Sequence, residues 1–153
     1  MHVFGEKGLI RIAKYLLDLV FLGGLLIFIG LPKILELYID VLRMTGYENY
    51  WFLLGFLYIT GFICLAMVRE MKKIFKNLDK NNPFIIENVK SLNRIAAGSF
   101  LLAISYIVKI FCYNSFFTII IAMIFIIFGL FMYVLAQVFY QAVMVKEEND
   151  LTI

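Results

Sequence analysis

The sequence predicts an all-α fold: a four-span transmembrane helical bundle with a cytoplasmic helical hairpin between the second and third spans. The first observation is composition, since hydrophobic residues make up 63% of the 153 residues, charged residues only 16%, and the mean hydropathy is +0.93. A soluble domain of this size buries only about 70% of the surface of its unfolded chain. The composition therefore excludes a soluble globular protein, a disordered chain and a secreted disulfide scaffold.

Long runs with few or no charges are the second observation, because a hydrocarbon core of about 30 Å needs about 20 apolar residues in a helix. The last run, 110–145, carries no charge and is too long for one crossing, and the polar turn Tyr113-Asn114-Ser115 divides it. The whole chain, 1–153, is predicted to form a single membrane domain. The expected spans are about 12–31, 49–68, 94–112 and 116–142.

The first span is preceded by basic residues, as a secretory signal peptide would be. Its apolar stretch is longer than a signal core, and no small-x-small cleavage site follows it. We therefore expect this segment to stay in the membrane as an anchor.

The third observation is the unequal distribution of lysine and arginine. The N-terminal segment, the link between spans two and three and the tail together hold 11 of the 14 basic residues, and the other two links hold 3. Cytoplasmic loops of membrane proteins carry an excess of Lys and Arg. We therefore expect a multi-pass protein of the cell membrane with both termini and the central link in the cytoplasm. Aromatic residues cluster at the predicted outer boundary, as amphipathic rings prefer: Tyr47, Tyr50, Trp51, Tyr113, Phe116 and Phe117.

The first outer link, 32–50, carries charges at helical spacing. This pattern favours either a helical extension of the first span or a short helix in the membrane interface, with Gly46 as the stop. The link is too short for an extracytoplasmic ligand-binding domain.

The central link, 69–93, is predicted to form a helical hairpin. Apolar residues recur every 3.6 residues from Met67 to Leu78, with basic residues on the other faces, so span two should continue as an amphipathic helix. A polar run then ends this helix. Asn82 is predicted to cap the next helix, with Pro83 at its first position.

Asp18 and Lys109 carry charges within predicted spans, where charges are costly and often functional. Asp18 could form a proton or cation site, although Lys14 lies one turn before it and favours an ion pair near the inner boundary. Lys109 could act in a pore or in an interhelical pair, although its place near the end of span three favours extension toward the headgroups.

No residue pattern indicates an enzyme, a metal site or a cofactor. The only histidine is His2, and the chain has no CxxC, no Ser/His/Asp set and no glycine-rich phosphate loop. Cys64 and Cys112 are predicted at different depths, so we expect no disulfide between them. We interpret Glu147 and Glu148 as solvated residues of an acidic tail, 146–153, that lies on the same side as the basic hairpin.

The basic hairpin could contact membrane lipids or an acidic protein face. Direct nucleic-acid binding is not expected, because no compact recognition module is present. Glycines in the first two spans allow close helix approach and, with it, a homo-oligomer.

Two motifs resemble those of a known family. The run Leu78-Asp79-Lys80-Asn81-Asn82-Pro83-Phe84, followed by Asn88, Leu92 and Ile95, is similar to the cytoplasmic loop of YoaS-like bacterial integral membrane proteins of unknown function. The ending, Val138-Phe139 and then 146–153, is similar to the closing motif of that family. The resemblance implies no known activity. It does imply a regulatory partner, because members are often encoded beside a small helix-turn-helix DNA-binding protein.

These observations favour a non-enzymatic bacterial membrane protein that relays a membrane or envelope condition to a cytoplasmic partner, such as a small helix-turn-helix regulator. Two alternatives stay open: an oligomeric transporter or channel subunit in which Asp18 faces a polar cavity, and a structural or immunity-type subunit of a larger membrane complex. The residues that we expect to bind the partner are Pro83, Phe84, Asn88, Glu147, Glu148 and Asp150.

The predicted topology can be tested by thiol labelling in a variant that lacks the native cysteines. Lys76→Cys and Asp150→Cys are expected to react with a membrane-impermeant maleimide only after the cells are permeabilised, because both sites are placed inside. A cysteine in the outer link, Glu36→Cys, is the control and should react in intact cells. Labelling of residue 76 or 150 from outside would overturn the orientation.

Overall fold

The computed structural model describes residues 6–42, 49–113 and 115–152, and these residues form four long helices without a strand. The helices are α1 (Glu6–Leu42), α2 (Tyr50–Asp79), α3 (Ile86–Cys112) and α4 (Phe116–Leu151). Each is long and apolar enough to cross a membrane. The predicted all-α class with four candidate spans is therefore confirmed, and the chain has the architecture of a multi-pass membrane protein.

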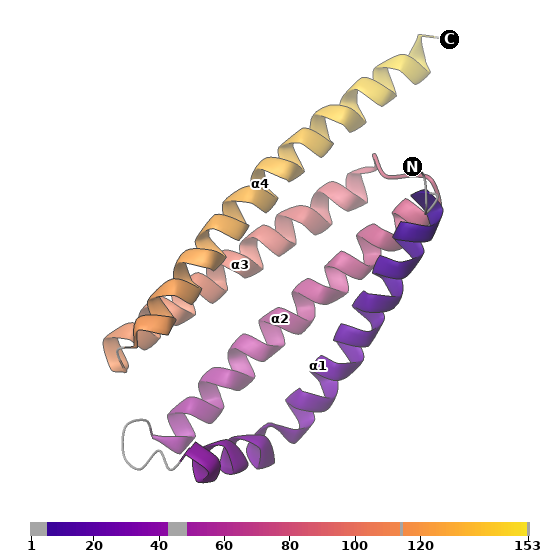
Figure 1. The fold of residues 1–153 in the computed structure, drawn as a ribbon. Coiled ribbons are helices and arrows are strands. Elements are labelled where there is room, and N and C mark those ends of the chain that lie inside the picture. The colour runs from indigo at the N-terminus through magenta and orange to yellow at the C-terminus, as the bar shows by residue number, and fades with distance from the viewer. Residues whose placement is uncertain (1–5, 43–48, 114, 153) are drawn as a thin grey trace, which may run out of the picture.

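The helices lie side by side in chain order (Figure 1). α1 packs on α2, α2 on α3 and α3 on α4, and among the described residues no other pair of helices packs together. Because successive helices run in opposite directions, the start of α1, the loop 80–85 and the end of α4 lie at the same end of the molecule (Figure 1). We call this end the hairpin end.

The first helix continues without interruption through Pro32 into the predicted outer link. Of the two predicted forms of this link, the helical extension is therefore confirmed. Proline lacks an N–H and its ring crowds the carbonyl four residues earlier, here that of Phe28, so it bends a helix. Figure 1 shows α1 changing direction in its C-terminal part. The stop predicted at Gly46 lies outside the described residues.

The hairpin between α2 and α3 is helical on both sides, but its second cap differs from the prediction. The amphipathic continuation of span two is confirmed, because α2 runs to Asp79. The predicted cap at Asn82 with Pro83 at the first helical position is wrong: both residues lie in the loop, and α3 begins at Ile86 without a side-chain cap.

Asparagine side chains and backbone close the loop instead. Asn81 adopts a left-handed conformation with φ of 58°. Its N–H donates to the Leu78 carbonyl at 3.0 Å, and the N–H of Asn82 donates to the Asn77 carbonyl at 3.2 Å. This pair of bonds is a Schellman motif, which satisfies carbonyls at the end of α2 and turns the chain back toward α3. Asn tolerates the left-handed region better than other non-glycine residues do.

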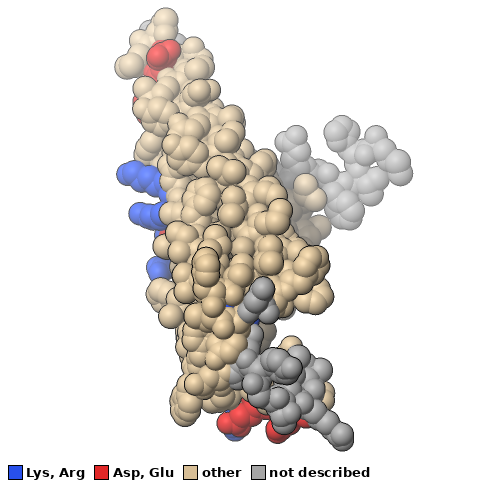
Figure 2. All heavy atoms as spheres, turned by 90° about the vertical axis from the view of Figure 1, so that its left-hand side faces the viewer, with Lys and Arg blue, Asp and Glu red and all other residues tan. Residues whose placement is uncertain are grey.

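Most of the molecular surface is apolar. Figure 2 shows a face that is largely uncharged, with basic side chains at one edge and acidic ones toward the ends. Large side chains such as Leu26, Ile29 and Phe111 are more than 70% exposed. Such exposure is expected of helices whose outer surface is solvated by lipid.

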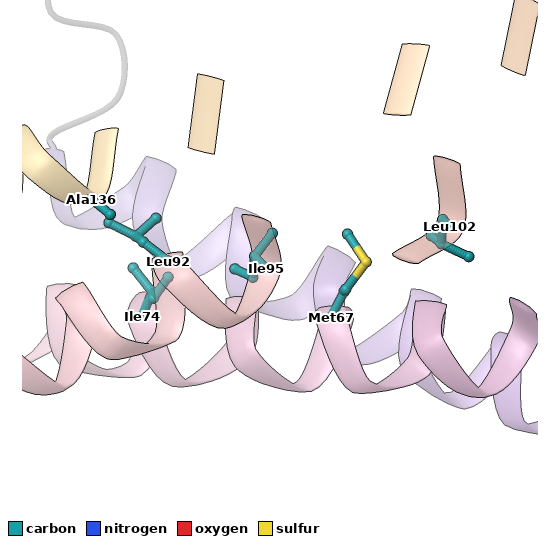
Figure 3. Close-up of a cluster of buried hydrophobic side chains, with 6 residues drawn as sticks. All are labelled: Met67, Ile74, Leu92, Ile95, Leu102 and Ala136. Carbon is teal, nitrogen blue, oxygen red and sulfur yellow. The ribbon is translucent and has the colours of Figure 1, made fainter. Parts of the chain in front are cut away.

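The packed core centres on α3 (Figure 3). Its six buried residues are Met67, Ile74, Leu92, Ile95, Leu102 and Ala136. Gly98 allows α2 to come close, since a Cβ at this position would lie 2.8 Å from Met67. Small residues at helix contacts are typical of membrane proteins, where apolar burial alone does not drive helices together.

Two buried hydroxyl groups within the predicted spans bond to their own helices. The Thr60 hydroxyl donates to the Phe56 carbonyl at 2.9 Å, and the Ser99 hydroxyl donates to the Ile95 carbonyl at 2.9 Å. Among the described residues, no buried side-chain nitrogen or oxygen lacks a partner. Polar groups inside the spans are therefore satisfied without water.

The left-handed residue of the loop provides a stability test. Asn81→Gly should keep or raise the melting temperature, because glycine adopts φ above zero without steric cost. Asn81→Val should lower stability by about 1–2 kcal/mol, the cost of a left-handed conformation for a residue with a branched Cβ. Thermal unfolding in detergent, followed by circular dichroism, measures both. Equal stability of the two variants would contradict the Schellman assignment.

Candidate functional site

Charged residues of the hairpin end join α1 to α2. Asp18 Oδ1 lies 2.7 Å from Lys72 Nζ, and Lys14 Nζ lies 3.3 Å from Asp79 Oδ2. The predicted ion pair between Asp18 and Lys14 is therefore wrong. Each of these residues pairs with a residue of α2 and not with the other. Lys72 Nζ also lies 4.6 Å from the centre of the Phe21 ring. All four ionic groups are about one-third exposed or more, so each pair contributes about 0–1 kcal/mol.

This pairing places Asp18 level with Lys72, beyond the predicted end of span two at residue 68. The carboxylate is engaged by a lysine at the hairpin end and does not lie at mid-span. At the other end, Lys109 Nζ lies 5.4 Å from the centre of the Phe56 ring of α2. Both predicted intramembrane charges thus contact the second helix.

Glu70, which no sequence motif singles out, makes more hydrogen bonds and ion pairs than any other acid among the described residues. Its carboxylate accepts hydrogen bonds from Lys73 at 2.6 Å and from the Ser91 hydroxyl at 2.8 Å, and Arg94 lies 3.5 Å away. The residue lies just past the predicted span, and its side chain is only 13% exposed. Burial alone would raise the pKa of the Glu70 carboxyl, but the hydrogen bonds and the two cations lower that pKa below its usual range.

A basic groove of about 400 Å³ lies between α2 and α3 at the hairpin end. Five cationic side chains and one acidic side chain line it, so its potential is positive. The lining residues are Lys73, Lys76, Asn77, Lys80, Glu87, Lys90, Ser91 and Arg94. The arrangement can attract phosphate or carboxylate groups, including lipid headgroups.

Asn88 has a different place from the one predicted. Its side chain is 0% exposed, so it offers no surface to a partner. Its amide donates to the Pro83 carbonyl at 2.7 Å and accepts from Asn77 at 2.8 Å. Asn88 therefore ties the loop to both helices of the hairpin, and we correct its expected role from partner contact to loop support.

Four of the other predicted partner residues meet where the loop contacts the end of α4. Phe84 is 42% exposed, and its ring centre lies 5.4 Å from that of Phe139. Two grooves flank Phe84, one of about 580 Å³ and one of about 260 Å³. Asp150 lines both grooves, Glu147 lines the smaller one, and Pro83 precedes Phe84 in the loop. We call Phe84, Glu147 and Asp150 the loop–tail surface.

The tail is joined to the loop by a hydrogen bond from a lysine to a neutral side-chain amide. Lys146 Nζ donates to Asn82 Oδ1 at 3.0 Å, between residues 64 positions apart. In the described part of the chain, no ion pair joins the acidic tail to the basic hairpin. Glu148 lines neither groove, so the structure separates it from Glu147 and Asp150.

Groups with chemical reactivity are scarce in the described residues. They contain no cluster of three or more His, Cys, Asp or Glu side chains that could hold a metal ion. Cys64 and Cys112 are free thiols. The side chains at the hairpin end suit binding. Cations line the groove between α2 and α3, and an aromatic ring and carboxylates form the loop–tail surface.

The buried amide of Asn88 leads to a stability prediction. Asn88→Ala should lower the free energy of unfolding by about 1–3 kcal/mol, because the Asn77 amide loses its acceptor and the Pro83 carbonyl keeps only the Ile85 N–H, at 3.2 Å, as a donor. Thermal melting in detergent is the measurement, and Lys90→Ala, an exposed residue of the same helix, is the control with little expected effect. A loss no larger than that of the control would contradict the loop-supporting role.

Comparison with known proteins places the chain in a family. A family model described as "Protein of unknown function (DUF2975)" matches residues 43–153, which include α2, α3 and α4. No curated protein and no solved structure matches the chain. The match covers both motifs on which the resemblance to YoaS-like proteins was based. Since it spans more than two thirds of the chain, this protein belongs to the family described as "Protein of unknown function (DUF2975)".

Proposed function

We propose that this protein is a non-enzymatic membrane relay that binds a cytoplasmic protein through its loop–tail surface. One observation carries the proposal: Phe84 stands between two grooves built by the loop and the end of α4, with Glu147 and Asp150 at their margins. Exposed aromatic residues beside grooves are the usual anchors of protein interfaces. The positive-inside distribution supports a cytoplasmic position for this end.

The chemistry of the surface indicates the kind of partner. Two carboxylates beside an aromatic ring suit a basic surface that contains an apolar pocket. A small helix-turn-helix regulator has such a basic surface, because it neutralises DNA phosphates. The tail would then compete with DNA for the regulator, so that binding to the membrane protein keeps the regulator from its operator.

The packing supports a way to relay a signal. The two grooves are formed jointly by the loop, which is tied to α3 by Asn88, and by the last turns of α4. The loop contacts α4 through the Phe84–Phe139 ring pair and the Lys146–Asn82 hydrogen bond. A displacement of α4 along α3 in the membrane would therefore open or close both grooves at the hairpin end.

The transporter or channel alternative has less support, because the carboxylate of Asp18 is engaged by Lys72 at 2.7 Å. A subunit role in a larger complex rests only on exposed apolar faces, which every lipid-exposed helix has. The relay is the function that specific side chains favour.

Photocrosslinking in cells tests the relay. Phe84→p-benzoylphenylalanine should give an adduct with one cytoplasmic protein, and the adduct should be a DNA-binding protein when identified by mass spectrometry. Phe117, which is 74% exposed near the opposite end of the molecule, is the aromatic control and should give no such adduct. Glu147→Lys with Asp150→Lys should lower the yield about tenfold, equivalent to 1.4 kcal/mol of binding.

The single variant Glu147→Lys should also lower the yield, and Glu148→Lys is its control with the same change of charge. Glu148 lines neither groove, so this control should leave the yield unchanged. An absent adduct, or equal losses with Glu148→Lys and Glu147→Lys, would overturn the proposal.

A further inference from the structure

An apolar trough of about 660 Å³ lies over α2 between α1 and α3. It exists because α1 and α3 both pack on α2 and, among the described residues, do not pack on each other. Each helix contributes apolar side chains to its walls. Those that define it best are Phe21, Leu25, Phe62, Ala66, Ala97 and Leu101.

The trough is charged at one end only. Arg69, Glu70 and Arg94 line it there. Arg69 directly follows predicted span two, 49–68, and Arg94 begins predicted span three, so both guanidinium groups lie at the level of the lipid headgroups. Arg94 also lines the basic groove, so that the apolar trough and the basic groove meet at this residue.

The two arginines retain donors for a ligand. Glu70 is engaged by Lys73 and Ser91, and Arg94 approaches it only to 3.5 Å while its side chain stays 62% exposed. Among the described residues, no carboxylate lies within ion-pair distance of Arg69. Guanidinium groups bind phosphate oxygens through paired N–H donors.

We propose that the trough binds an anionic phospholipid, with an acyl chain along α2 and the phosphate between Arg69 and Arg94. Phe62 precedes Arg69 by seven residues, or about 10 Å of helix, which suits the upper part of an acyl chain. The volume falls within the range of about 300–1,000 Å³ that small-molecule sites have. Charge complementarity with the basic groove selects an anionic headgroup over a zwitterionic one. The site is separate from the loop–tail surface and does not depend on the proposed partner.

Native mass spectrometry of the delipidated full-length chain in detergent tests this site. Phosphatidylglycerol and phosphatidylcholine with identical acyl chains are titrated separately. The expected result is at least about fivefold tighter binding of the anionic lipid, and loss of this preference in the double variant Arg69→Gln, Arg94→Gln. The double variant Arg11→Gln, Lys33→Gln removes the same net charge outside the trough and should keep the preference.

A steric variant separates the trough from a headgroup effect alone. Ala66→Phe fills the trough and should lower the affinity for both lipids several-fold. The melting temperature of this variant in detergent should stay unchanged. Equal binding of the two lipids, or loss of preference in both double variants, would overturn the proposal. Displacement of the anionic lipid by millimolar inorganic phosphate would also overturn it, because the site would then bind free anions. So would a dimer in which a second copy covers the trough and excludes lipid.

Discussion

The absence of water from the hydrocarbon core is the constraint on which this structure depends. Each backbone N–H and C=O in the core must be satisfied within the protein, so the described part of the chain forms four helices of 27 residues or more. The same constraint explains why Thr60 and Ser99 bond to carbonyls of their own helices. Because lipid is as apolar as the side chains, the hydrophobic effect does not hold these helices together. Van der Waals contact between closely packed helices does so instead, as at Gly98 against Met67.

Where the helices leave the core, polar interactions take over the structural role. Asparagines build the turn of the hairpin: Asn81 supplies the left-handed residue, and Asn88 binds both the loop and α2. A loop held in this way keeps Phe84 at a defined position beside α4. The position of Phe84 thus depends on a neighbouring amide that is itself fully buried.

The row arrangement has a second consequence for function. In a closed bundle the first and last helices would cover the faces of the middle ones. Here α1 packs only on α2 among the described helices, and an apolar trough is left between α1 and α3. The family match begins after α1, at residue 43, and includes the three helices that form the packed core. Ion pairs from Asp18 and Lys14 attach α1 to this core at its charged end.

The sequence by itself determined the helical class, the number of spans and their approximate positions, because apolar run length and charge distribution act locally along the chain. It also located the loop and tail whose side chains meet around Phe84. Three predictions from the sequence were wrong: a helix cap at Asn82, an ion pair between Asp18 and Lys14, and an exposed Asn88. In the tertiary structure Asn82 lies in the loop, Asp18 pairs with Lys72, and Asn88 is buried. The reason is physical: a cap, an ion pair and the burial of an amide depend on which neighbouring helix comes within about 3 Å, and helix registry is set by packing between segments far apart in the chain.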